Sequence, residues 1–195
     1  MTTPLDPRSL AIDFDLKVGL SPDRPSIKRH LSAMSGMYAD QSAFDQLVAD
    51  DPMIYEFYDC GVPETESGIA FGTTITYPGL VGDEYYMTKG HFHTVLDTAE
   101  VYYCLSGAGY LLMENPEGDW EAQELHPGAA VYVPGRYAHR SINTAAGEPL
   151  VSFFAFRADA GHDYRTIETK GFRKRIVRRA GLPEIIDNPA WSNQS

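Results

Sequence analysis

The chain has 195 residues, of which 43% are hydrophobic, and its formal net charge at pH 7 is −11. This length suits one sizeable core, so we expect a single domain over residues 1–195 with its core at about 53–165. The negative charge would repel nucleic-acid phosphates and anionic membrane surfaces, which excludes both as partners. No apolar run approaches membrane-spanning length, and the N-terminus lacks a basic stretch followed by an apolar one, so we expect a cytoplasmic protein.

The N-terminal region, residues 1–52, combines two patterns. Four prolines predict an extended arm over residues 1 to about 25, which could lie across a neighbouring subunit. From residue 26 to 50, apolar residues recur near helical spacing with an interruption at Gly36, which predicts one or two short helices. His30 would then occupy an exposed helix position.

After residue 52 the pattern changes to short strands separated by turn-forming residues. We expect strands at 53–59, 70–77, 84–93, 101–105, 110–113, 130–133, 139–143 and 151–156. Many short strands with turns between them indicate a closed antiparallel sandwich or barrel. Cys60 and Cys104 lie in apolar settings and are expected to be buried thiols without a disulfide.

The C-terminal extension, residues 166–195, carries a run of basic residues from Lys170 to Arg179. Such a run usually forms a solvated face, although in an acidic protein it could also dock against an acidic patch. We favour the solvated interpretation and expect a surface appendage.

Three residues in the middle of the chain, His91, His93 and Glu100, form the pattern His-x-His-x₆-Glu. Side chains two positions apart on a strand point the same way, so the two histidines can reach one centre. With His139 the set offers three nitrogens and one oxygen, which suits Fe²⁺, Mn²⁺, Zn²⁺ or Ni²⁺ better than Ca²⁺. We predict one divalent ion per subunit, with Fe²⁺ preferred over the other three.

The other interpretation is that these histidines are ordinary core or surface residues. Two buried imidazoles on one strand face would lose hydration unless an ion or a hydrogen-bond partner held them, which favours the metal. His126 precedes Pro127-Gly128 and is expected to be a turn residue.

The segments around these ligands, residues 82–107 and 128–143, resemble the two cupin motifs. Two departures are present: six residues separate His93 from Glu100 where most cupins have three or four, and Gly135 directly follows Pro134. The long gap before Glu100 narrows the resemblance to one family. Together with this gap, four segments resemble the cupin-type phosphoglucose isomerases: TYPGLVGDEYYMTKGHFH, AEVYYCLSGAG, VYVPGRYAHRSIN and ADAGHDYRTI. The resemblance implies an all-β double-stranded β-helix, or jelly-roll barrel, with an N-terminal arm, short flanking helices, a C-terminal extension and a homodimeric state.

The resemblance also implies that the chain interconverts glucose 6-phosphate and fructose 6-phosphate, in glycolysis and gluconeogenesis. Moving hydrogen between C1 and C2 requires a group that carries the proton, and Glu100 is the first candidate. A carboxylate held on a cation is a weak base, so proton transfer by Glu100 and a metal-assisted hydride shift both stay open. Tyr102 shares strand parity with Glu100 and is expected to donate to a sugar oxygen, or else simply to fill the barrel.

For the phosphate group, the resemblance points to hydroxyls, a backbone amide and an imidazole at Thr74, Thr88, Gly90 and His162. Strand parity would instead turn Lys89 inward as a charge partner, unless a bulge at Gly90 breaks the alternation. His162 could equally be a turn residue paired with Asp163. The family tends to carry a tyrosine where this chain has Phe156, which removes one possible donor.

Two other functions are compatible with the same ligands. An Fe²⁺-dependent cupin dioxygenase would use the metal to activate O₂, and a non-catalytic cupin would only bind sugar phosphates.

Overall fold

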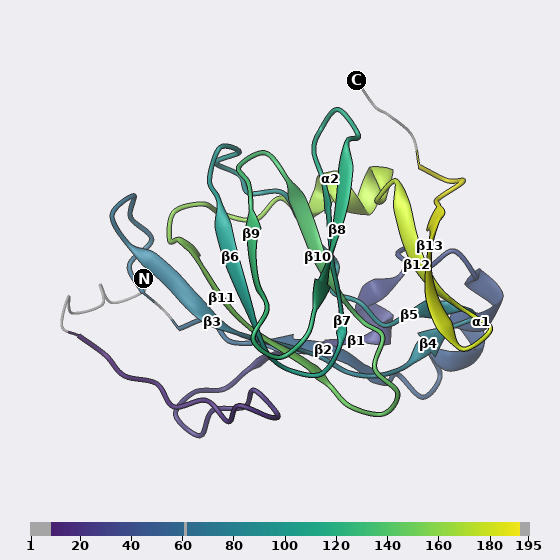
Figure 1. Ribbon diagram of the computed structural model, residues 1–195, viewed down its shortest axis with the longest axis horizontal. Coiled ribbons are helices and arrows are strands. Elements are labelled where there is room, and N and C mark those ends of the chain that lie inside the picture. The colour runs from purple at the N-terminus through teal and green to yellow at the C-terminus, as the bar shows by residue number, and fades with distance from the viewer. Residues whose placement is uncertain (1–8, 61, 192–195) are drawn as a thin grey trace.

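The computed structural model describes residues 9–60 and 62–191, and within them the chain is almost entirely β-sheet (Figure 1). A six-stranded sheet contains, in spatial order, β1 (Ile27–His30), β2 (Met53–Phe57), β3 (Ile69–Thr76), β11 (Leu150–Arg157), β6 (Glu100–Ser106) and β9 (Ala130–Val133). A three-stranded sheet contains β10 (Ala138–Asn143), β7 (Gly109–Glu114) and β8 (Trp120–Leu125). A four-stranded sheet contains β13 (Leu182–Asp187), β12 (Lys174–Arg179), β5 (Glu84–Tyr85) and β4 (Leu80–Val81).

The barrel arises because the chain alternates between the first two sheets. β6 and β9 lie in the six-stranded sheet, β7, β8 and β10 in the three-stranded sheet, and β11 returns between β3 and β6. Alternate residues of β6 are buried, so one face of the strand supplies the interior. This is the double-stranded β-helix that we expected. Its interior is packed by Tyr102, Cys104, Leu111, Met113, Leu125, Val131, Val133, Leu150 and Phe154.

The N-terminal region differs from the expectation in one element. The 3₁₀ helix η1 (Leu31–Met34) and α1 (Gln41–Leu47) confirm two short helices, but residues 27–30 form β1 and not a helix. β1 pairs antiparallel with β2, where main-chain hydrogen bonds to β2 outweigh the local helical pattern. His30 therefore lies half-buried on a strand, with Nδ1 2.9 Å from the Asp51 carbonyl oxygen.

The described part of the arm lies on the barrel of its own chain, along the lower edge of the molecule in Figure 1. The Thr73 hydroxyl donates to the Gly19 carbonyl oxygen at 2.7 Å, and the Ser106 hydroxyl donates to that of Lys17 at 2.7 Å. Ile12 and Phe14 pack against buried residues of the sheet. Residues 1–8 of the predicted arm lie outside the described residues.

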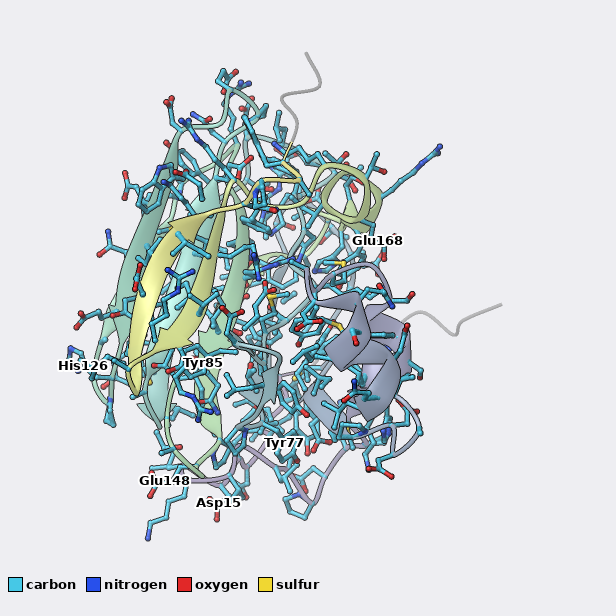
Figure 2. All side chains as sticks on the ribbon, turned by 90° about the vertical axis from the view of Figure 1, so that its right-hand side faces the viewer. Asp15, Tyr77, Tyr85, His126, Glu148 and Glu168 are labelled. Atoms are coloured by element: carbon cyan, nitrogen blue, oxygen red, sulfur yellow. The ribbon has the colours of Figure 1, made fainter. Side chains whose placement is uncertain are left out.

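The basic run is not the solvated appendage that we expected. Its residues 174–179 form β12, which pairs with β13 and β5, and Ile176 and Val177 are buried in this third sheet. Figure 2 looks onto this hairpin, with Tyr85 of β5 beside it. Ile176 and Val177 are adjacent and point to opposite faces, so the centre of β12 is buried on both faces, while Arg178 and Arg179 at its end remain exposed. The run of basic residues therefore contains a strand. Residues 192–195 lie outside the described residues.

Lys170 ends α2 (Tyr164–Lys170), a helix that we did not predict, and is itself buried. Its ammonium lies 2.8 Å from the Glu114 carboxylate, which also accepts from the Trp191 indole at 2.8 Å. We expect Lys170→Met to lower the free energy of unfolding by about 3 kcal/mol, because it leaves a buried carboxylate without its cation. Chemical denaturation measures this change, with Lys28→Met, at an exposed lysine of β1, as the matched control; equal stability of both variants would contradict it.

Cys60 and Cys104 are buried free thiols, as expected. None of the helices in residues 9–60 and 62–191 is long and apolar enough to cross a membrane.

Candidate metal centre

The segment that carries His91 and His93 is not the continuous strand that we expected. β5 ends at Tyr85, and beyond it single bridges join Met87 to Ile142 and His91 to His139. Gly90 adopts φ +74°, a left-handed conformation that breaks the alternation of side chains. The break explains how the neighbours Thr88 and Gly90 reach the same cavity as His91.

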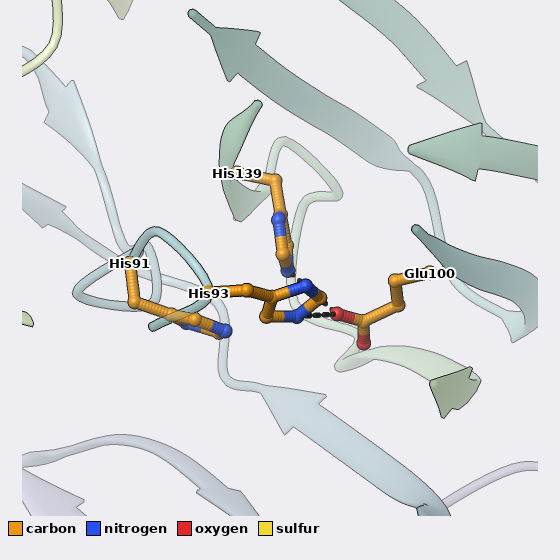
Figure 3. Close-up of side chains that lie close together, drawn as sticks. All are labelled: His91, His93, Glu100 and His139. Carbon is orange, nitrogen blue, oxygen red and sulfur yellow. Dashed lines mark hydrogen bonds and ion pairs between the residues drawn. The ribbon is translucent and has the colours of Figure 1, made fainter. Parts of the chain in front are cut away.

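The four predicted ligands converge on one point. His91 and His93 come from this irregular segment, Glu100 begins β6 and His139 lies in β10. One potential ligand atom from each of the four lies within 4.8 Å of the others. Figure 3 shows the three imidazoles and the carboxylate facing a common centre. The Glu100 Oε2 atom lies 3.1 Å from His93 Nε2 and 2.9 Å from His139 Nε2.

Neighbouring groups turn the imidazole nitrogens toward this centre. His93 Nδ1 lies 3.0 Å from the Thr98 carbonyl oxygen and 2.9 Å from the Thr98 hydroxyl, which leaves Nε2 for the centre. His139 Nδ1 lies 3.3 Å from the Tyr137 carbonyl oxygen. In the described part of the chain, the Nε2 atoms of His91 and His139 are buried without a hydrogen bond, although His139 Nε2 lies 2.9 Å from the Glu100 carboxylate. These free nitrogens and the adjacent carboxylate fit a divalent transition metal.

The electrostatics place His91 and Glu100 in the form that binds a metal ion. Burial lowers the pKa of His91 well below its usual value, which keeps the imidazole neutral. Burial alone would raise the pKa of Glu100, but His139 and His93 hold it far below its usual range, so the carboxylate is ionised. The pKa of His93 is raised despite burial, because Glu100 accepts from the protonated ring. A metal ion would displace this proton on binding.

The centre opens onto a cavity of about 390 Å³. Eight of the predicted or discussed residues line it: Thr74, Thr88, Gly90, His91, Glu100, Tyr102, Phe156 and His162. His93 and His139 lie behind this surface. Burial and the Glu100 charge raise the pKa of Tyr102 well above its usual value, so its phenol keeps its proton. Burial lowers the pKa of His162, whose ring centroid lies 4.4 Å from that of His91.

Two predicted or suggested contacts differ in the structure, those of Lys89 and of His162 with Asp163. Lys89 does not line the cavity, and its ammonium lies 2.6 Å from the Glu168 carboxylate of α2. Asp163 is the N-cap of α2, accepting from the Thr166 N–H at 3.2 Å, so it is not a partner reserved for His162. Phe156 stacks on His93 with ring centroids 5.5 Å apart.

Three tyrosines in the cavity wall, Tyr55, Tyr58 and Tyr164, were not among the predicted site residues. Tyr55 of β2 and Tyr164 of α2 both line the cavity, and the Tyr164 ring stacks on His162 with centroids 5.8 Å apart. Strand parity could have placed Tyr55 inward, but only packing of α2 against the barrel brings Tyr164 there.

This barrel, with three histidines and a glutamate at one end of its interior, defines a cupin with a site that could bind a metal ion. A family model described as "Glucose-6-phosphate isomerase (GPI)" matches residues 28–191, and the chain belongs to that family. A protein named "Glucose-6-phosphate isomerase" from Thermococcus gammatolerans is 44% identical over 185 residues, covering 95% of this chain and 97% of the relative. One of the same name from Sinorhizobium medicae is 37% identical over 186 residues, covering 93% and 86%. A solved structure titled "Recombinant oxalate oxidase in complex with glycolate" aligns with TM-score 0.48 and 11% identity, covering 60% of this chain and 58% of that one.

Proposed function

We propose that the chain is a metal-dependent isomerase that interconverts glucose 6-phosphate and fructose 6-phosphate. The observation that carries the proposal is the four-residue cluster opening onto a cavity of about 390 Å³ with hydroxyl and imidazole donors on its walls. Family membership supports the substrate. When bound, a divalent ion supplies positive charge beside the two adjacent oxygens of the open-chain sugar. We propose Fe²⁺ as this ion, with Mn²⁺, Zn²⁺ or Ni²⁺ as alternatives, because the ligand set suits all four.

The chain's own residues have separable roles in this proposal. The protonated Tyr102 hydroxyl donates to a sugar oxygen, and the ionised Glu100 either carries the proton between C1 and C2 or only holds the ion. His162, whose pKa burial lowers in the free chain, acts at the phosphate as a hydrogen-bond donor. Among the described residues that line the cavity there is neither lysine nor arginine, so phosphate recognition depends on hydroxyls, imidazole and main-chain amide.

The proposal is tested by stripping the purified protein with a chelator and reloading it separately with each of the four ions. We expect the stripped protein to lose isomerisation of fructose 6-phosphate and at least one ion to restore it. Failure of all four would overturn the isomerase assignment. Oxygen consumption with a small organic substrate would favour the dioxygenase, and fructose 6-phosphate binding without turnover would favour the non-catalytic cupin.

Thr88 provides a direct test of the phosphate end. Its hydroxyl oxygen accepts from the Ser141 N–H at 3.1 Å, which leaves the hydroxyl hydrogen free to donate into the cavity. We expect Thr88→Val to raise KM for fructose 6-phosphate by about 10-fold, the effect of one hydrogen bond to a charged group, with kcat unchanged. Steady-state kinetics measure both constants, and Thr144→Val, at a threonine that does not line the cavity, is the control. A wild-type KM would remove Thr88 from the phosphate site.

We propose a homodimer that pairs through the outer face of the six-stranded sheet. There, Phe71, Ala155, Val101 and Tyr132 are aligned across β3, β11, β6 and β9. Tyr132 is 63% exposed and Val101 43% exposed, a row of apolar groups that a second copy would cover. Analytical ultracentrifugation of Tyr132→Lys tests this, and we expect the variant to sediment as a monomer. A variant with the same oligomeric state as the wild type would contradict the proposal.

We place the protein in the cytoplasm because both cysteines are free and buried, as in a reducing compartment.

A further inference from the structure

Arg140 is a buried cation next to the candidate ligand His139. Only 5% of it is exposed, and in residues 9–60 and 62–191 no carboxylate forms an ion pair with it. Successive residues of β10 point to opposite faces, so Arg140 lines a separate cavity of about 140 Å³ and not the one lined by Glu100. The Glu84 carboxylate, which lines the same cavity, pairs directly with Arg175 and acts on Arg140 only from beyond ion-pair distance. A buried cation without a direct ion pair is costly to the folded state, which indicates a role other than stabilising the fold.

The Arg140 guanidinium lies behind the Lys89–Gly90 segment, on the side away from the catalytic cavity, the cavity of about 390 Å³ that Glu100 and Gly90 line. Nη2 donates to the Lys89 carbonyl oxygen, and Nη1 lies 3.0 Å from the Met87 sulfur. The guanidinium carbon lies 4.4 Å from the centroid of the Phe172 ring, a cation–π contact. These contacts fix the guanidinium, and through it the direction of the Lys89 carbonyl.

The Lys89 carbonyl and the Gly90 N–H belong to the same peptide group. In a trans peptide the two point in opposite directions. Since the carbonyl points to Arg140, behind the wall, the N–H points to the other side, where Gly90 lines the catalytic cavity. No hydrogen bond within the described part of the chain uses this N–H.

The Gly90 position leaves little freedom for the peptide to turn. A Cβ built at Gly90 would lie 2.7 Å from the Phe172 ring and 3.0 Å from the Arg140 Cβ. The wall is also tied to α2, since Lys89 pairs at 2.6 Å with Glu168, which Figure 2 labels. Arg140, Phe172 and Glu168 thus hold the 89–90 peptide from behind.

We propose that Arg140 is a positioning residue, which orients the 89–90 peptide so that the Gly90 N–H donates to the phosphate group of the substrate. The inference rests on the proposed isomerase function and adds to it a residue that determines specificity without touching the sugar phosphate. An oriented amide carries particular weight here because the described lining of the cavity has no lysine or arginine.

The test compares metal-loaded wild type with Arg140→Met, which cannot donate, and Arg140→Gln, whose amide can still donate to the Lys89 carbonyl. We expect Arg140→Met to raise KM for fructose 6-phosphate by about 10- to 100-fold, with kcat and metal content unchanged. The KM of Arg140→Gln should lie between those of wild type and Arg140→Met. Inhibition by inorganic phosphate should weaken in the same order. Arg136→Met, which removes an exposed arginine paired with Glu117, is the control and should behave as wild type.

A purely structural role would give a different pattern: a lower melting temperature and less bound metal, with an unchanged KM in the remaining active enzyme. That result, or a wild-type KM in Arg140→Met, overturns the proposal; if Arg140→Met does not fold, the KM of Arg140→Gln decides. An inactive wild type would instead show that the isomerase proposal has failed. In that case the affinities of wild type and variants for fructose 6-phosphate, measured by calorimetry, decide on Arg140.

Discussion

Replacement of His93 by alanine is expected to abolish metal retention and, with it, isomerase activity. His93 Nε2 faces the centre because Thr98 holds the opposite nitrogen at 3.0 Å through its carbonyl oxygen and at 2.9 Å through its hydroxyl. Loss of one ligand from a set of four should weaken metal binding by more than about 100-fold, since even loss of an orienting partner costs 10- to 100-fold. Elemental analysis after gel filtration, together with the rate of fructose 6-phosphate isomerisation, measures both effects.

The control is His126→Ala, which removes an imidazole from an exposed turn and should leave metal content and activity at wild-type values. His93→Asn addresses the cavity that alanine would leave in a buried site, because its amide takes the position of Nδ1 and can still bond to Thr98. Full metal occupancy in His93→Ala, with a wild-type melting temperature, would show that the ion is held elsewhere.

Glu100→Gln is expected to lower kcat by about 1,000-fold, within the range for loss of a general base, while sugar-phosphate binding persists. Glu100 is ionised because His139 and His93 depress its pKa below the usual range despite burial. The amide is almost isosteric but has neither the charge that a cation needs nor the basicity that proton transfer needs. Turnover and calorimetric binding of fructose 6-phosphate, measured at equal metal occupancy, separate catalysis from affinity.

Isomerisation in deuterium oxide then distinguishes the two roles of Glu100. Deuterium on the sugar carbon of the product would show that the carboxylate exchanges its proton with solvent during the transfer. Product without deuterium would favour a hydride shift, with Glu100 acting only as a ligand. Wild-type kcat in Glu100→Gln would contradict both roles.

Periodicity predicted most of the barrel because its strands obey one local rule. β2, β3, β6, β7, β9, β10 and β11 all fall where alternating or β-branched runs lie between turn-forming residues. The strands that were missed, such as β8 and β12, are rich in charged residues. For these segments pairing with a neighbouring strand, and not the composition of the segment, decides the conformation.

The metal set was predictable for a similar reason, since His91, His93, Glu100 and His139 carry their chemistry in residue type and spacing. The place of Lys89 was not predictable, because strand parity fails where Gly90 turns the chain, and Glu168 is 79 residues away. The role inferred for Arg140 depends on where the Lys89 carbonyl points, which no local pattern encodes.

The sequence by itself therefore determined the barrel class, the buried thiols and the four residues of the candidate metal centre, since each depends on residue type and short-range periodicity. Only the tertiary structure decided the course of the arm, the third sheet and the orientation of the 89–90 peptide. These depend on contacts between segments far apart in the chain, whose free energies outweigh the local preferences of the residues involved.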